Sequence, residues 1–534
     1  MLSRVNNHTN LGTAFERLSP ICAHPTLQRA VVIGAGIAGL ACAARLYAAG
    51  YAVTLLERHG TVGGKIRTLP SQAGPIDAGP TVLTMRHLFD DLFAQLDTRI
   101  DDHVTLIKQN TLARHFWADG STLDLFADQD QSTAAVHAFA GPKAARQFER
   151  FCARTSRLFA AFDKPMMQAP EPRIGSLTAH VMANPTLIPA MAPLSTLARL
   201  LRSSFDDPRL RQLFGRYATY VGGSPTHAPA ILSLIWQAEA SGVWVVQGGM
   251  HKLTHALGQL LTKRGVDIRT DTHVDRIEVQ HDRATGVHLM DGTRLPCDVV
   301  VHAGDPRALP TGTLGPDTRQ IATQTLKTAR SFSARVLSFA AAPLGPELAH
   351  HNVFFASDPK DEFDDLMAGR IPAQPSFYIC ALDRGQGSIP PALERFEIIT
   401  NAPATPDDTD DTPDEDLSPW LLQITHQMAQ HGMTFSPTPT TQAVTTPQAF
   451  ARMFPASLGA LYGQTPHGLT AALSRPTART QIPNLYLAGG GTHPGAGVPM
   501  ATLSASHAVA AILSDRTSTS MSAPTAMRGG ISTA

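Results

Sequence analysis

The sequence lacks most of the features that mark secreted, metal-binding or nucleic-acid-binding proteins. Its five cysteines lie at least 20 residues apart and include no Cys-x-x-Cys pair, which argues against a disulfide framework or a zinc ribbon and favours a reducing cytoplasm. Lys and Arg together number 44, as many as Asp and Glu, so no positive excess is available to bind nucleic acid. Charged residues make up only 16% of the chain, against about 25% in an average protein, and such a surface favours an apolar substrate or a membrane as partner.

Long uninterrupted apolar runs are also missing. The most apolar stretch, residues 30–56, is broken by Arg45 and by several glycines, so it does not predict a membrane span. The first 25 residues contain three charged side chains and no apolar core, and we expect residues 1–27 to be a disordered tail rather than a signal peptide. With 534 residues, the chain is long enough for two or three domains.

The strongest positive signal is a glycine-rich turn between an apolar strand and a helix, Gly34-x-Gly36-x-x-Gly39. A second apolar strand, 51–56, leads to Glu57, 18 residues after Gly39 and close to the about 20 expected for the acid that binds a ribose hydroxyl. In such a βαβ unit the glycines allow a tight turn, close approach of the backbone to a pyrophosphate, and close packing of the helix on the sheet. The pattern predicts a dinucleotide site at the N-terminus of the helix.

Two other glycine-rich segments invite comparison with this turn. The segment 60–66 is similar to a phosphate-binding P-loop, but Ile66 stands where that loop needs Ser or Thr as a magnesium ligand. Near the end of the chain, residues 484–500 again join an apolar strand to a glycine-rich turn, followed by a helix from about Ala501. The backbone amides of this second turn are expected to face an anionic or polarised group.

The rest of the chain divides by its periodicity. Residues of about 90–240 recur mostly at helical spacing and predict a separate helix-rich module. Residues 266–295 alternate apolar and polar, and Asp291-Gly292 marks a hairpin turn. His251 and His255 have the i, i+4 spacing of two zinc ligands, but no Glu lies between them and no third ligand is evident, so we predict no metal site.

Four segments, in this order along the chain, together resemble one family. They are the βαβ unit with Gly63-Gly64-Lys65, the loop at 77–81, the segment 242–250 and the terminal loop 487–497. The family is that of the bacterial carotenoid desaturases of the phytoene desaturase type, and the resemblance covers about residues 28–512. Within it, residues 77–85 and 220–225 look most like the 1-hydroxycarotenoid 3,4-desaturases, the hydroxyneurosporene or methoxyneurosporene desaturases.

The resemblance implies an α/β fold with two domains. One is an FAD-binding Rossmann-type domain of the kind found in amine oxidases and phytoene desaturases, and the other is a helix-rich substrate domain. The FAD-binding domain would comprise residues 28–90, 245–310 and 471–514. The substrate and membrane-facing domain would comprise residues 91–244 and 311–470, and residues 515–534 would form a second disordered tail.

The resemblance also implies FAD as the cofactor and assigns residues to it. The pyrophosphate would be held by Gly34, Gly36 and Gly39, the adenosine ribose by Glu57, the adjoining phosphate region by Gly64 and Lys65, and the adenine would lie near Val274. The residues expected to close over the ribityl chain and the isoalloxazine ring are Gly490, Gly491, Thr492, Pro499 and Met500.

The chemistry implied by the family is the removal of a hydride to the flavin and of a proton from the neighbouring carbon. Because a conjugated polyene delocalises positive charge at the allylic carbon, a strong general base is unnecessary. An acyclic carotenoid would occupy a long apolar tunnel with a few polar groups at its hydroxylated end. The candidates for polar or catalytic groups are Arg154, Arg216, Tyr217, Tyr220 and His493. An Arg or Tyr in a helical module is more often structural, whereas His493 lies beside the terminal glycine turn.

Three alternatives remain open: a phytoene desaturase, an amine oxidase, and a non-catalytic isoprenoid-binding escort protein. The small number of Trp (four) and Tyr (seven) argues against the aromatic cage of an amine oxidase, and the intact glycine turn with Glu57 argues against the escort protein. The final electron acceptor is either oxygen or a quinone or another carrier. A lipid-soluble substrate implies a cytoplasmic enzyme in peripheral contact with the inner membrane, where residues 187–202 either lie in the interface or form an ordinary core helix.

Overall fold

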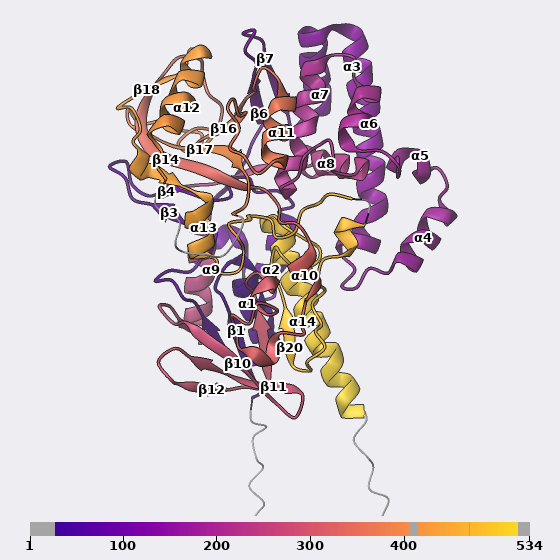
Figure 1. The fold of residues 1–534 in the computed structure, drawn as a ribbon, viewed down its shortest axis with the longest axis vertical. Coiled ribbons are helices and arrows are strands. Elements are labelled where there is room, and N and C mark those ends of the chain that lie inside the picture. The colour runs from indigo at the N-terminus through magenta and orange to yellow at the C-terminus, as the bar shows by residue number, and fades with distance from the viewer. Residues whose placement is uncertain (1–26, 406–414, 469, 522–534) are drawn as a thin grey trace, which may run out of the picture.

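A five-stranded parallel sheet forms the centre of one half of the molecule, at the bottom of Figure 1. The computed structural model describes residues 27–405, 415–468 and 470–521. The sheet has the order β20-β13-β1-β2-β9, all in parallel pairs, and takes its strands from distant stretches of chain. These strands are β1 (Arg29–Ile33), β2 (Ala52–Leu56), β9 (Asp267–Arg269), β13 (Val299–His302) and β20 (Leu485–Leu487).

The parallel sheet is covered on both faces, as its apolar strands require. Side chains alternate along β1, so Ala30 and Val32 pack into one core and Val31 into another. The first core lies under α1 (Ile37–Ala48), α9 (His251–Lys263) and α14 (Val498–Met521). The second lies under an antiparallel sheet of β10 (Val274–Gln280), β11 (Arg283–Leu289) and β12 (Arg294–Pro296). The hairpin predicted at Asp291-Gly292 connects β11 to β12.

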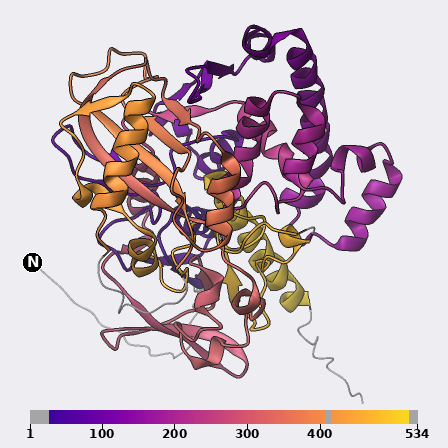
Figure 2. The ribbon, with the colours of Figure 1, turned by 45° about the horizontal axis from the view of Figure 1, so that its top comes forward.

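A mixed eight-stranded sheet and a helical module lie side by side above the parallel sheet in Figures 1 and 2. The order is β18-β14-β17-β16-β15-β6-β7 with β19 also paired to β14, and only β6 and β15 run parallel. Its strands are β6 (Thr111–Phe116), β7 (Thr122–Phe126), β14 (Ser333–Leu344), β15 (His351–Phe354), β16 (Phe377–Ala381), β17 (Glu394–Ala402), β18 (Thr434–Ser436) and β19 (Val444–Thr445).

The helical module is built from the segment 129–240. Its helices are α3 (Gln129–Phe162), α4 (Ile174–Ala183), α5 (Leu187–Met191), α6 (Leu197–Ser204), α7 (Pro208–Gly215) and α8 (Ile235–Ala240). The remaining helices are α2 (His87–Ala94), α10 (Gln324–Lys327), α11 (Pro359–Met367), α12 (Ser418–Gln430) and α13 (Pro447–Met453). Two short strand pairs complete the fold, β3 (Thr68–Leu69) with β4 (Ile76–Asp77), and β5 (Leu106–Lys108) with β8 (Trp244–Val246).

The structure corrects two expectations about these segments. The stretch read as mostly helical also contains β5, β6 and β7, because short strands with few residues give a weak alternation signal. The tail expected to be disordered from residue 515 continues α14 as far as Met521. Asp515 holds this end of the helix, since its carboxylate accepts hydrogen bonds from Arg479 at 3.0 Å and from the Tyr486 hydroxyl at 2.9 Å. Residues 1–26 and 522–534 of the two predicted tails lie outside the described residues.

The segment 187–202 is two short helices rather than one. Helix α5 ends at Met191, Ala192 adopts a left-handed conformation with φ of +44°, and α6 begins only at Leu197. Leu197 packs into the core of the helical module, whereas Leu194 between the helices is 91% exposed. Among all helices within the described ranges, none is both long enough and apolar enough to cross a membrane.

Candidate active site

A cavity of about 1150 Å³ lies where the parallel sheet meets the two upper layers. It begins at the carboxyl ends of β1, β2, β13 and β20, where parallel α/β sheets bind ligands. It then continues between the helical module and the eight-stranded sheet along mostly apolar side chains. This volume exceeds the upper limit of roughly 1000 Å³ for an ordinary single-ligand pocket, so the cavity has room for more than one molecule.

The glycine turn after β1 opens directly into this cavity. Gly34 has a φ of +98°, and its N–H donates to the carbonyl of Leu56 at 2.7 Å. A Cβ atom on Gly36 would meet nothing closer than 4.0 Å, so the protein itself does not require glycine there, and the space above Gly36 belongs to the cavity. A Cβ atom on Gly39 would lie 1.8 Å from the carbonyl oxygen of Gly34, so this glycine is required where α1 packs on the turn. The N-terminus of α1 therefore presents open backbone N–H groups to a ligand.

Glu57 lies at the carboxyl end of β2 with only 4% of its surface exposed. Its carboxylate accepts hydrogen bonds from the backbone N–H of Ala35 at 2.8 Å and of His59 at 3.0 Å, and it lines the cavity. These bonds use one lone pair on each oxygen and leave acceptor capacity for a hydroxyl group.

The Gly63-Gly64-Lys65 segment packs against the glycine turn. The N–H of Gly63 donates to the carbonyl of Ala35 at 2.8 Å. The Lys65 ammonium lines the cavity and donates to the carbonyl of Leu461 at 2.7 Å. Burial lowers the pKa of Lys65 to about 8, and within the described residues no carboxylate forms an ion pair with it.

The terminal turn closes the opposite side of the cavity. Gly489 has a φ of +115°, and Gly490 and Gly491 after it face the cavity. Arg475 holds this turn against the segment before it, since its guanidinium donates to the carbonyl of Gly490 at 2.8 Å and to that of Tyr462 at 3.0 Å. Burial lowers the pKa of Arg475 to about 10.

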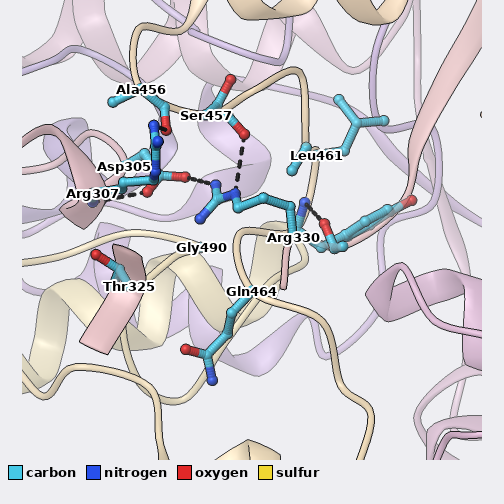
Figure 3. Close-up of polar contacts among 12 residues, drawn as sticks. Asp305, Arg307, Thr325, Arg330, Ala456, Ser457, Leu461, Gln464 and Gly490 are labelled. Carbon is cyan, nitrogen blue, oxygen red and sulfur yellow. Dashed lines mark hydrogen bonds and ion pairs between the residues drawn. The ribbon is translucent and has the colours of Figure 1, made fainter. Parts of the chain in front are cut away.

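A buried ion pair joins three parts of the cavity wall, as Figure 3 shows. Asp305, just after β13, pairs with Arg330, which approaches β14. Asp305 also accepts a hydrogen bond from the N–H of Arg307 at 3.0 Å, and Arg330 donates to the carbonyl of Ser457 at 3.1 Å (Figure 3). Neither charged residue was predicted from the sequence, although the position of Asp305 at the carboxyl end of a parallel strand is a usable signal.

The predicted cofactor residues are brought together, with three of them behind the cavity surface. Those that line the cavity are Gly34, Gly36, Glu57, Lys65, Val274, Gly490, Gly491, Pro499 and Met500. Gly39 and Gly64 lie one layer back in packing contacts. Thr492 is fully buried, and its hydroxyl has no hydrogen-bond partner within the described part of the chain.

Only part of the predicted polar set reaches the cavity. Arg216 and Tyr220 line it, and Tyr217 lies directly behind them. His493 does not line it, because its Nε2 faces the Ala169 carbonyl at 2.9 Å and its ring stacks on a histidine of α14. Arg154 is also absent from the lining, and burial in α3 lowers its pKa.

Glu239 is a further polar cavity residue that was not predicted from the sequence. It accepts a hydrogen bond from the hydroxyl of Tyr217 at 3.0 Å and another from that of Tyr220 at 2.8 Å. A usable signal existed, because Glu239 is the only acidic residue between Asp207 and Asp267. A single carboxylate in so long a stretch indicates a specific partner.

Two sets of buried histidines outside the cavity lining contact other protein groups. His251 contacts the Asp77 carboxylate at 2.8 Å. The ligand-type atoms of His350, His351 and Cys380 lie within 4.8 Å of one another, and the Cys380 sulfur is 3.5 Å from Nε2 of His350. A thiol–imidazole hydrogen bond explains this contact, and the absence of a metal site stays a prediction.

Comparison with known proteins shows the family to which the chain belongs. The family described as flavin containing amine oxidoreductase matches residues 37–339. The chain is 51% identical over 498 residues to a hydroxyneurosporene desaturase of Cereibacter sphaeroides, covering 92% of this chain and 99% of that protein. It is 48% identical to a hydroxyneurosporene desaturase of Rhodobacter capsulatus, covering 91% and 98%. A putrescine oxidase variant of known structure matches with a TM-score of 0.58 at 12% identity, over 92% of this chain and 99% of that one, which shows the shared fold.

Fold and site thus define a flavin-dependent oxidoreductase of the amine oxidase fold. The chain belongs to the flavin-containing amine oxidoreductase family, in which it groups with the hydroxyneurosporene desaturases, and its cofactor is FAD. The predicted fold class and cofactor are confirmed. The cavity fits that group, because the space over Gly36 admits a pyrophosphate and Glu57 retains free acceptor capacity beside it.

Proposed function

We propose that this protein desaturates the C-3,4 bond of a 1-hydroxylated acyclic carotenoid such as 1-hydroxyneurosporene, in carotenoid biosynthesis. The observation that carries the proposal is a single cavity that joins the dinucleotide turns to an apolar extension. That extension is lined by Met85, Phe159, Met167, Leu201 and Phe355, among others. The names of the relatives that match nearly the whole chain support the same substrate class.

The cofactor assignments follow from position. Gly34 and Gly36 receive the pyrophosphate at the N-terminus of α1, and Glu57 accepts from the ribose hydroxyls. Gly64 and Lys65 support the adjoining phosphate region, and Val274 lies on the adenine side. The terminal turn at 490–492 with Pro499 and Met500 closes over the ribityl chain and ring.

When bound, FAD supplies the chemistry of accepting a hydride from a C–H bond. The residues of the chain bind and orient the substrate. The apolar lining orients the polyene and keeps water from the reacting carbons. The allylic positive charge is delocalised along the conjugated chain, so loss of the neighbouring proton requires no strong base.

A substrate that dissolves only in lipid must enter from a membrane, and the helical module offers the surface for this contact. Helices α4 and α5 project from the body of the molecule in both ribbon views (Figures 1 and 2). Exposed apolar side chains gather there: Ile174, Met182, Ile188 and Leu194. The exposed Arg199 and Arg202 on α6 add positive charge for anionic headgroups. We expect a peripheral protein of the cytoplasmic face of the inner membrane.

Anaerobic incubation of the liposome-bound holoenzyme with 1-hydroxyneurosporene and, separately, with phytoene tests the function. Desaturation lengthens the chromophore, so the absorption of the hydroxylated pigment should shift to longer wavelength as the flavin bleaches. A response to phytoene alone would identify a phytoene desaturase instead, and no response to either carotenoid would overturn the proposal.

Flotation with anionic liposomes tests the membrane contact separately. The double variant Met182→Glu and Leu194→Glu should lose most of the floating fraction, because both side chains leave the apolar interface. Ile389→Glu is the matched control, since Ile389 is 94% exposed in a loop away from α4 and α5. Equal flotation of all three proteins would contradict this surface.

A further inference from the structure

Arg216 is a cation with unused hydrogen-bond donors at the wall of an apolar cavity. It belongs to the 3₁₀ helix Arg216–Val221, which follows α7. Its two terminal nitrogens donate to the Tyr220 hydroxyl at 3.0 and 2.8 Å. Its Nε is buried and has no partner within the described residues. A guanidinium carries two N–H groups on each terminal nitrogen, so each of these nitrogens keeps one donor for an oxygen acceptor in the cavity.

Glu239 supplies the complementary acceptor beside this cation. Its carboxylate lines the cavity and accepts the hydroxyl of Tyr217 on one oxygen and that of Tyr220 on the other. Burial raises the pKa of both tyrosines, so both keep the protons that they donate. Each carboxylate oxygen has a second acceptor site free. The cavity wall therefore offers a donor and an acceptor side by side, the pattern that matches an alcohol.

A series of contacts links the 3₁₀ helix of this cluster to the terminal glycine turn. Gly222 packs so closely on the Tyr462 ring that a Cβ atom on it would lie 2.6 Å from a ring carbon. Arg475 in turn fastens the Tyr462 carbonyl to that of Gly490. In a 1-hydroxylated chain, the carbon bearing the hydroxyl is only two bonds from C-3. A group that binds this hydroxyl must therefore lie next to the cofactor turns rather than at the distant end of the cavity.

We propose that Arg216 and Glu239, which the Tyr220 hydroxyl holds side by side, bind the tertiary hydroxyl of the carotenoid, and that this contact sets the preference for hydroxylated substrates. Arg216 donates a hydrogen bond to the hydroxyl oxygen, and Glu239 accepts one from the hydroxyl group. The proposal rests on the proposed function and adds the residues that select its substrate. An unsubstituted chain leaves the buried charges without their partner, which penalises its binding. A methyl ether keeps the bond from Arg216 and loses the one to Glu239.

Binding to the holoenzyme with its flavin chemically reduced tests the proposal, because the reduced enzyme cannot turn over. The Kd values of 1-hydroxyneurosporene, its methyl ether and neurosporene are measured from polyene absorption in detergent. We expect the wild type to bind the hydroxylated chain about 10- to 100-fold more tightly than neurosporene, the range for a hydrogen bond to a charged group, with the ether between them.

Arg216→Met and Glu239→Gln should each reduce this ratio towards 1, and Glu239→Gln should bring the alcohol and the ether together. Tyr378→Phe is the control, because Tyr378 also lines the cavity but its hydroxyl bonds to Thr81 and His351 instead. Flavin occupancy and thermal unfolding report whether each variant is folded. If Arg216→Met does not fold, Glu239→Gln still tests the site, because it keeps the side-chain volume.

The outcomes separate the two proposals. The hydroxyl site is wrong if the preference for 1-hydroxyneurosporene over neurosporene is unchanged in a folded, flavin-containing Arg216→Met or Glu239→Gln protein. It is also wrong if the wild type binds and desaturates 1-hydroxyneurosporene and neurosporene equally. In those cases the proposed desaturation still stands. If the wild type binds no carotenoid at all, the proposed function itself is wrong.

Discussion

Substitution of Gly36 by valine should abolish FAD binding while leaving the fold intact. The backbone at Gly36 has a φ of −66° and a ψ of 177°, which any residue adopts without strain. Its Cβ atom would lie 4.0 Å from the nearest protein atoms, so the change costs the protein little beyond about 1 kcal/mol for a poorer helix N-cap. The valine methyl groups would instead occupy the space assigned to the pyrophosphate.

Gly39→Ala makes the opposite change one turn further along the same helix. Its Cβ atom would lie 1.8 Å from the Gly34 carbonyl oxygen, so α1 must move away from the turn. Overpacking against backbone is expected to cost about 3 kcal/mol or more in the free energy of unfolding. Gly175→Ala on α4 is the neutral control, because its Cβ atom would meet nothing within 4 Å.

The two effects are distinguished by unfolding each apoprotein in urea with and without FAD. FAD at 100 times its Kd should stabilise the wild type and Gly175→Ala by about 2.7 kcal/mol and leave Gly36→Val unchanged. Gly39→Ala should be destabilised already without FAD. A Gly36→Val protein that purifies with a full complement of flavin would refute the assignment of this turn to the pyrophosphate.

Three further predictions concern charged residues of the site. Burial lowers the pKa of Lys65 from 10.5 to about 8, so between these pH values the unfolded chain binds more protons than the folded protein. The free energy of unfolding of the apoprotein, relative to that of Lys65→Met, should therefore rise by about 3 kcal/mol as the pH rises from 8 to 10.5. Unfolding free energies of the two proteins that change in parallel with pH would contradict the buried amine. Asp305→Asn leaves the buried Arg330 without its partner and should cost about 3–5 kcal/mol in urea unfolding, whereas a change under 1 kcal/mol would show that the ion pair is unimportant. Glu57→Ala removes the acceptor for two backbone N–H groups and should lower the free energy of unfolding by about 1–3 kcal/mol for each group left unpaired. Its flavin occupancy should fall below that of Glu57→Gln, and full flavin occupancy in Glu57→Ala would show that Glu57 does not bind the ribose.

The nucleotide half of the site was predictable because its signals are local. The turn at Gly34, its helix and the acid at Glu57 lie within one short stretch, where each glycine has a steric reason that the sequence alone reveals. The structure adds that two of these glycines act differently: Gly36 faces open space and Gly39 a backbone carbonyl.

The polar half of the cavity was only partly predictable. Arg154, Arg216, Tyr217 and Tyr220 stood out as polar residues in the helical module, and His493 stood out beside the terminal glycine turn. Of these five, Arg154 and His493 do not line the cavity and Tyr217 lies behind its surface. Spacing on one segment cannot show which side of a helix meets a cavity formed by other segments. The pairings of the two tyrosines with Glu239, about twenty residues further along the chain, depend on that packing.

The sequence by itself determined the βαβ unit, the second glycine turn and hence the class of cofactor, because these depend on backbone conformation that neighbouring residues dictate. Only the tertiary structure decided which charged groups hold the cavity wall together. Asp305 meets Arg330, and Arg475 meets the Gly490 carbonyl, through contacts between different segments of the chain. Such contacts are selected by the burial of whole layers against one another, a property of the assembled core that no single stretch of chain carries.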